Sequence, residues 1–384
     1  MLAAMLFCNG AAAQISDTIH PIVSLGYTYD DNLLRLPENY PIEQHSDRMT
    51  QLQAGVLFDR PIGRQRLSGR LKATRVTFDH FDQLDYNGKD AGADLAWQVG
   101  NHVSGSLGAA YVQSLTPFSD FQSDERNVRT QRTGKGSVAW RFHPSWQVRA
   151  GVTRNEYEYE LLSQRGSNRN ERLAEVGFDY LASSGSKVGL VASQWRGSYE
   201  NPRIVGGARL GGDFKQNELK LNVNWLASAV TQVSVLAGYA RREYATGRDS
   251  GGADGRVSAS WAPLGKVRFN AAAWREFAAV ESTVATSSQN TGGSLGATWD
   301  VSSHLQATAS YRREKRDFEQ SSAILNDRDS VDQRRSSSLG LVWVPRKSIQ
   351  LGITAFQENR SGAALIGTSD YRAAGVSLSA TAQF

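Results

Sequence analysis

Apolar and polar residues alternate with a period of two along many long stretches of this chain. The alternation is clearest at the C-terminus, where Val376, Leu378 and Ala380 share one face and Ser377 and Ser379 share the other. A period of two is typical of β-strands, because successive side chains point to opposite faces of a sheet. The pattern therefore predicts strands with one apolar and one polar face.

A unit the size of a hairpin repeats along the chain. In each copy an alternating segment ends in an aromatic residue beside a short turn, and these residues are Phe58, Trp97, Trp140, Tyr180, Trp225, Trp261, Trp299 and Trp343. Their spacing of 36 to 45 residues leaves room for two long strands, one short turn and one longer loop. Soluble strands average about five or six residues, whereas membrane strands need about nine to eleven. The repeat therefore favours strands that cross a membrane.

Eighteen strands are predicted, separated alternately by short turns and by longer polar loops. We place them at 20–30, 47–59, 64–78, 86–98, 103–116, 127–142, 147–159, 169–182, 187–199, 213–227, 233–245, 252–262, 266–278, 287–300, 305–318, 332–344, 349–358 and 371–384. This asymmetry predicts an all-β fold, a transmembrane antiparallel up-and-down β-barrel with short periplasmic turns and longer extracellular loops. A soluble β-sandwich or propeller is the alternative, against which strand length, the many outward Ala and Gly residues and the terminal Phe384 all count.

Aromatic residues are expected in two girdles, because rings with an apolar body and a polar tip favour membrane interfaces. The eight aromatic residues beside the short turns would form the periplasmic girdle. The outer girdle would contain Tyr111, Tyr157, Tyr159, Tyr199, Tyr244, Phe277, Tyr311, Phe318 and Phe356.

The N-terminus has the features of a secretion signal. Residues 1–13 are apolar and end in Ala11–Ala13, a small-residue cleavage pattern, so residues 14–384 would form the barrel. A positive segment before the apolar run is missing, which suggests a truncated start. Cys8 is the only cysteine, so the mature chain is expected to have none. No run of about 18 apolar residues occurs, and a membrane-spanning helix is therefore not expected.

The segment Tyr29-Asp-Asp-Asn-Leu-Leu-Arg-Leu-Pro37 resembles the start of a known family. It is similar to the EpsL-type outer-membrane β-barrel proteins of exosortase (PEP-CTERM)-associated exopolysaccharide biosynthesis loci. The resemblance implies a role in exopolysaccharide biosynthesis or export at the bacterial outer membrane. It carries over no catalytic residues.

Basic side chains at polar strand positions are the main candidate functional residues. A charge that faces lipid at mid-depth costs about 2–4 kcal/mol, so these side chains would line the lumen and favour anions. They are Arg70, Lys72, Arg149, Lys220, Arg256 and Arg268. A second basic group crowds the loop ends of hairpins, at Arg241, Arg242, Arg312, Arg313, Lys315, Arg316, Arg334 and Arg335. The alternative is that basic residues pair with lumen acids such as Asp94, Glu175, Asp179 and Glu218, or bind lipopolysaccharide phosphates at the rim.

No nucleophile motif is visible, and the six histidines are scattered. Asp30, Asp31 and Asn32 offer the only metal argument and favour a turn. We therefore expect no catalytic site, metal or cofactor, and a secretion signal argues against nucleic acid.

The sequence favours a part in exopolysaccharide biosynthesis or export, as a basic-lined conduit for an anionic polymer. The alternatives are a general or solute-specific porin, a structural barrel without transport, and a barrel-embedded enzyme. A loop folded into the lumen would favour a porin, and a smooth basic channel would favour polymer passage. Expected partners are outer-membrane lipid and lipopolysaccharide, a polysaccharide, and the assembly machinery that recognises a final strand ending in Phe384.

Overall fold

The computed structural model describes residues 18–201, 203–205, 208–210, 213–245, 249–279, 285–320, 331–362 and 368–384. The predicted signal peptide, residues 1–13, lies outside the described residues.

Eighteen long antiparallel strands form one sheet. Their bounds are β1 Ile19–Asp30, β2 Asp47–Ile62, β3 Gln65–Phe78, β4 Tyr86–Val99, β5 Val103–Leu115, β6 Val128–His143, β7 Trp146–Tyr159, β8 Arg169–Leu181, β9 Lys187–Tyr199, β12 Phe214–Ser228, β13 Thr231–Tyr244, β14 Ser250–Leu264, β15 Val267–Ala279, β16 Ala285–Asp300, β17 Leu305–Gln320, β18 Val331–Arg346, β19 Ile349–Ser361 and β20 Tyr371–Gln383. The prediction of eighteen strands is confirmed, with each end placed to within a few residues. The small hairpin of β10 (Arg203–Val205) and β11 (Ala208–Leu210) was not among the predicted elements.

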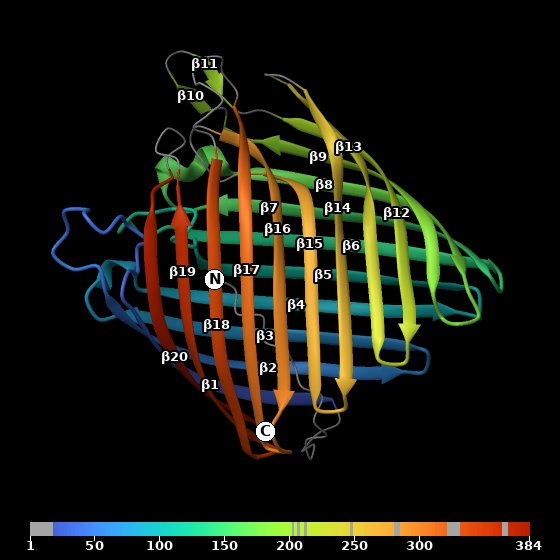
Figure 1. Ribbon diagram of the computed structural model, residues 1–384, viewed down its shortest axis with the longest axis horizontal. Helices are drawn as coiled ribbons and strands as arrows, with labels where there is room; N and C mark the ends of the chain where they lie inside the picture. The colour runs from blue at the N-terminus through green and yellow to red at the C-terminus, as the bar shows by residue number, and fades with distance from the viewer. Residues whose placement is uncertain are drawn as a thin grey trace.

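The sheet closes into a barrel because its first and last strands pair with each other. In this pairing Ile22 on β1 lies opposite Gln383 on β20, and the register continues without a shift to Asp30 opposite Gly375. In Figure 1 the strands of the near wall, such as β15 to β18, cross those of the far wall, such as β3 to β6, at a steep angle. Strands that tilt against the axis of a barrel produce this crossing.

Connections at the two ends of the barrel differ in length. Short turns such as 63–64 and 144–145 join strands at one end, which we call the short-turn end. Longer connections such as 31–46 and 116–127 join them at the other, the long-loop end. Two short 3-10 helices, Asp82–Leu84 and Leu162–Ser167, lie in these longer connections. No helix in the described part of the chain is long and apolar enough to cross a membrane.

The outer face of the barrel carries a band of exposed aliphatic side chains. Members of this band are 55–67 % exposed and come from both halves of the ring: Leu71, Leu107, Val152, Val176, Leu190, Leu219, Leu295 and Leu339. Alternate residues on the same strands are polar and face the lumen. So much exposed aliphatic surface is unfavourable in water, and a band around a closed barrel matches the hydrocarbon layer of a membrane.

The girdle predicted at the short-turn end shares this outer face. Trp140, Trp225, Trp261, Trp299 and Trp343 are all half exposed. Tyr180 is also exposed, while Phe58 and Trp97 are half-buried at equivalent register positions, opposite Ile19 and Gly105.

The predicted outer girdle is wrong for most of its members. Tyr111 and Tyr311 do lie on the outer face, opposite Ala91 and Leu295. Inward register positions hold Tyr157, Tyr159, Tyr199, Tyr244, Phe318 and Phe356. Phe277 is buried, and its ring lies beneath the guanidinium of Arg242. Above the apolar band the alternation is reversed. Outward positions there carry charges such as Glu156 and Arg172, and the aromatic rings pack inside.

Candidate functional site: a constricted lumen

Residues 31–37, the first part of the connection between β1 and β2, fold into the mouth of the barrel around Asn32. The side-chain amide of Asn32 donates to the carbonyl oxygens of Leu36 (2.7 Å) and Arg372 (2.9 Å), and its oxygen accepts from the Leu36 amide (3.0 Å). Arg35 adopts a left-handed backbone conformation with φ of 59°. Its guanidinium bridges to Asp30 at 2.8 Å. Burial alone would lower the pKa of Arg35, but the neighbouring Asp30 carboxylate raises it above its ordinary value.

Leucines of this loop form a small hydrophobic core inside the long-loop end. Leu33, Leu34 and Leu36 pack against Val76, Phe78, Phe81 and Leu84 from β3 and the connection that follows it. Phe118, from the connection between β5 and β6, packs against the same cluster. The segment Tyr29–Pro37 therefore builds a packed wall in the barrel mouth.

The loop of residues 116–127 crosses the lumen. It leaves the barrel from β5 and returns at β6, and it contacts residues of β17 and β19. In the closed ring of eighteen strands, β17 lies nine strands from β6 in either direction, on the opposite side. Arg360 on β19 donates to the Ser119 carbonyl oxygen at 2.7 Å, and Arg316 on β17 lies 3.9 Å from the Asp120 carboxylate.

The wall that receives the crossing loop is a buried network of ion pairs. Asp332 binds both Arg316 (2.6 Å) and Arg360 (2.5 Å), and Glu358 binds Arg334 at 2.7 Å. The Tyr371 hydroxyl also donates to Glu358. Gln122 joins this wall to the first loop, because it donates to the Arg35 carbonyl oxygen and accepts from Ser369. Acids and bases alternate in this network, so it holds the loop in place without a large net charge.

The six predicted pore-lining residues all lie on the inward face, but they do not gather into one site. Four of them pair with acids: Arg70 with Asp90, Arg149 with Glu175 and Asp179, Lys220 with Glu218 and Asp254, and Arg256 with Glu276. Among described residues, no carboxylate pairs with Lys72 or Arg268. The alternative of charge pairing along the lumen wall thus applies to most of the predicted set, including the acids Glu175, Asp179 and Glu218. Asp94 pairs with Lys135.

A polar concavity of about 580 Å³ lies on the lumen wall below the network. Its inward side chains are mostly hydroxyls: Ser234, Ser258, Ser260, Ser294, Ser310 and Ser336, together with Asn270 and Arg312. Arg312 lies four residues from Arg316 on the same strand, so this concavity is about 13 Å from the crossing-loop contact.

Trp274 organises two guanidinium groups at the upper edge of the concavity. Its ring lies 4.8 Å from the guanidinium carbon of Arg256 and 4.3 Å from that of Arg312. The indole N–H donates to Glu314 at 3.0 Å. Because Trp274 is 4 % exposed while the Arg side chains are 41 % and 50 % exposed, the ring fixes two cations that face the lumen.

The crossing loop and Trp274 were not among the predicted site residues, although each left a signal in the sequence. Phe118 and Phe121 are unusual in a loop expected to face water, and Trp274 is an aromatic residue in phase with the polar positions Arg268 and Asn270. Within the described ranges, no group of three or more His, Cys, Asp and Glu side chains is placed to hold a metal ion.

No protein-family model and no curated protein sequence matches this chain. The structure resembles OccK2 (OpdF) of Pseudomonas aeruginosa with a TM-score of 0.50 and 12 % identity, covering 96 % of this chain and 98 % of that one. It also resembles OccAB3 of Acinetobacter baumannii (TM-score 0.49, 11 % identity, 96 % and 100 % covered) and the outer membrane protein OpdK of Pseudomonas aeruginosa (0.48, 10 %, 96 % and 99 %). At these identities the likeness concerns the fold alone. A closed barrel with an apolar outer band and a polar lumen identifies this protein as an outer-membrane β-barrel of eighteen strands.

Proposed function

We propose that this protein is a constricted porin that admits small hydrophilic solutes and favours anionic ones. The observation that carries the proposal is the crossing of the lumen by residues 116–127, which dock on the opposite wall through Ser119 and Asp120. A loop in this position obstructs part of the lumen, so the proposed cargo is a small solute and not a bulky polymer. The barrel of eighteen strands is otherwise wide enough for an aqueous channel.

The preference for anions rests on how the lumen charges are exposed. Buried pairs at the crossing-loop contact neutralise each other. Lys72 and Arg268 also face the lumen and have no carboxylate partner among the described residues. Beside the serine-lined concavity, the partly exposed guanidinium groups of Arg256 and Arg312 pair with Glu276 and Glu314, each at 2.6 Å, and can still donate from their remaining N–H groups. Ammonium and guanidinium groups donate charge-assisted hydrogen bonds to a carboxylate or phosphate. Serine hydroxyls beside them can bind the rest of a polyhydroxylated solute. The same groups offer no nucleophile paired with a base, so we propose passive passage and no catalysis.

Swelling of proteoliposomes in isosmotic solutes tests the proposal. We expect fast swelling in arabinose and gluconate, slow swelling in raffinose and none in dextran, with gluconate faster than an uncharged sugar of similar size. Liposomes without protein are the control. Swelling no faster than this control in every solute would contradict the porin function. Equal swelling rates in gluconate and in a neutral hexose would contradict the anion preference.

The resemblance of Tyr29–Pro37 to the EpsL-type proteins suggests a more specific function, which is a role in exopolysaccharide export. The inward fold of this segment and the crossing loop favour small solutes over a polymer, so we rank this reading second. Deletion of the gene tests it directly: normal secreted polysaccharide in the deletion strain would exclude it, and loss that the gene restores would support it.

A further inference from the structure

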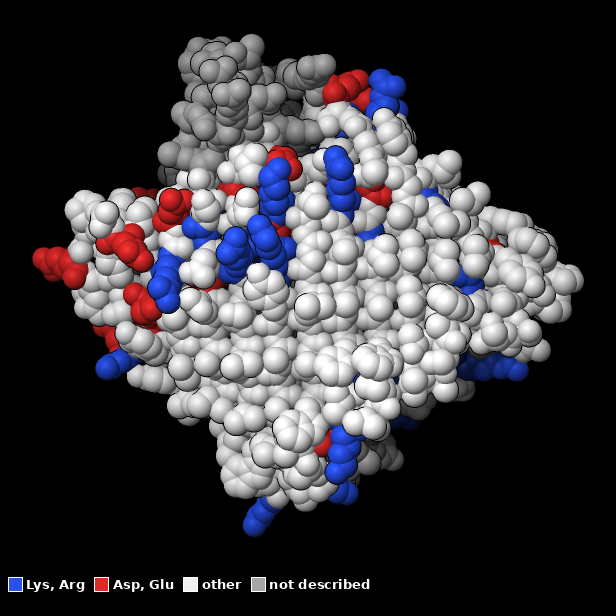
Figure 2. Space-filling model, viewed as in Figure 1, with Lys and Arg blue, Asp and Glu red and all other residues white. Residues whose placement is uncertain are grey.

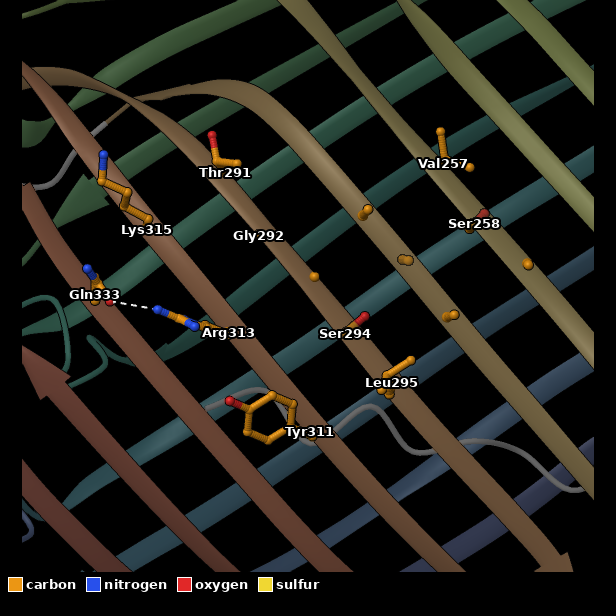
Figure 3. A pocket seen from close by; sticks show the side chains of 15 residues that line it. Val257, Ser258, Thr291, Gly292, Ser294, Leu295, Tyr311, Arg313, Lys315 and Gln333 are labelled. Atoms are coloured by element: carbon orange, nitrogen blue, oxygen red, sulfur yellow. Dashed lines mark hydrogen bonds between the residues drawn. The ribbon is translucent and has the colours of Figure 1, made fainter.

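An apolar groove lies on the membrane-facing side of the barrel wall, across β14 to β18. Its volume is about 640 Å³. The floor consists of Ala259, Ala271, Ala273 and Gly293, and Val257, Leu295 and Tyr311 form its sides. These residues have the outward register, opposite to that of Ser258 and Ser294 on the same strands. In Figure 3 the side chains of Leu295 and Tyr311 project from neighbouring strands at the edge of the groove.

Basic side chains lie at the long-loop end of this groove. Arg313 and Lys315 follow Tyr311 at successive outward positions of β17, and both line the groove. Arg335 on β18 lies directly opposite Arg313 in the strand register. Figure 2 shows basic side chains gathered over the long-loop half of this face, above a broad band with almost no charge.

Two of these three cations lack a carboxylate partner among the described residues. Lys315 pairs with Asp317 at 2.8 Å, but Arg313 donates only to the neutral Gln333, at 3.2 Å, and Arg335 has no carboxylate partner there. Like charges directly opposed across two strands repel each other. An anion bound between Arg313 and Arg335 would remove this repulsion, since each guanidinium can donate two hydrogen bonds to one phosphate.

We propose that this groove binds a phosphorylated lipid of the outer leaflet, of the lipid A type, with an acyl chain along Ala271 and Gly293 and a phosphate between Arg313 and Arg335. Two properties of the site select this occupant. The groove lies on the hydrocarbon-facing side, where an acyl chain is the available apolar group. A second copy of the chain that presented the same surface would bring two basic patches together, which is unfavourable.

Native mass spectrometry of the purified barrel, exchanged into detergent and titrated with defined lipids, tests the proposal. We expect affinity to fall in the order bisphosphoryl lipid A, monophosphoryl lipid A, phosphatidylcholine. The double variant Arg313→Gln/Arg335→Gln should lose about tenfold in affinity for bisphosphoryl lipid A, because charge-assisted hydrogen bonds are lost. Gly293→Phe should fill the groove and weaken binding several-fold. A Cβ at this position meets nothing closer than the Ala272 carbonyl oxygen at 3.4 Å, so the barrel should still fold.

Arg172 and Arg196 supply a matched control. They are also directly opposed on the outer face, on β8 and β9, and are exposed. The variant Arg172→Gln/Arg196→Gln should bind bisphosphoryl lipid A within about twofold of wild type. An equal loss of affinity in both double variants would contradict a specific site and would indicate general attraction of the lipid to the basic rim. If Gly293→Phe binds the lipid as wild type does, or if inorganic phosphate alone displaces the lipid, the groove does not bind an acyl chain. A dimer that Gly293→Phe dissociates would assign the groove to a second copy. None of these results depends on whether the barrel conducts solutes.

Discussion

The guanidinium Nη1 of Arg360 donates a 2.7 Å hydrogen bond to the carbonyl oxygen of Ser119, a residue 241 positions earlier in the chain. Arg360 also binds the buried carboxylate of Asp332. One side chain thus links the crossing loop to an ion pair that the opposite wall holds rigidly. The narrowing of the lumen therefore depends on a few contacts near the mouth, which can be changed without altering the strands.

Replacing Asn32 by Ala should loosen the loop of residues 31–46. The substitution removes three side-chain hydrogen bonds, two to Leu36 and one to the Arg372 carbonyl oxygen, and leaves buried backbone groups without partners. Each such group costs about 1–3 kcal/mol. We expect faster amide hydrogen exchange at 31–37 and unchanged exchange in β15 to β18. Exchange at 31–37 as slow as in wild type would contradict this account of the loop.

Replacing Lys220 by Met should destabilise the barrel strongly. Lys220 lies between the carboxylates of Glu218 (2.8 Å) and Asp254 (2.5 Å), and all three side chains are nearly buried. Removing the cation leaves two unpaired carboxylates, at a cost of about 3–5 kcal/mol. Heat-modified migration on gels should change at a clearly lower temperature than in wild type.

The matched control for Lys220 is Arg66→Met. Its pair with Asp59 is exposed, at 67 % and 39 %, so solvent screens it and the transition temperature should barely change. Equal temperatures for both variants would show that the buried triad contributes no more than a surface pair.

Lys72→Glu with Arg268→Glu should shift the reversal potential in a salt gradient toward cations. These two inward residues have no carboxylate partner among described residues, so their charge acts on passing ions. Arg149→Glu, by contrast, would place a third acid beside Glu175 and Asp179 and should mainly impair folding. An unchanged reversal potential in the double variant would exclude a role for Lys72 and Arg268 in ion preference.

The strands could be predicted from the sequence because a membrane imposes a strict rule on each of them. Outward positions such as Leu219 and Leu221 must be apolar through the hydrocarbon layer, while Lys220 and Asn222 face the lumen, so a period of two persists over ten or more residues. The tryptophans beside the short turns could be placed for the same reason.

The candidate site could not be predicted in this way, because it depends on contacts far apart in the sequence. Nothing local to Ser119 or Arg360 indicates that they meet. The rule of alternation also fails above the hydrocarbon layer, where outward positions carry Arg154 or Glu156 and inward ones carry Tyr157 or Tyr159. For this reason the sequence predicts an outer girdle that most of these rings do not form. The sequence does offer pairing with lumen acids as an alternative, but which acid meets Arg149 or Arg256 depends on the register of the neighbouring strands.

Single-channel conductance in planar bilayers tests the central claim most directly. We compare wild type with Asp120→Asn/Arg360→Gln, which removes the side-chain bridges from β17 and β19 to the crossing loop and leaves Arg316 paired with Asp332. Arg64→Gln, in an exposed turn at the opposite end, is the control. We predict small, discrete, anion-preferring channels for wild type and the control, and conductance several-fold larger and noisier for the double variant. Equal conductance in all three proteins, or no channels in any of them, would contradict a lumen narrowed by residues 116–127.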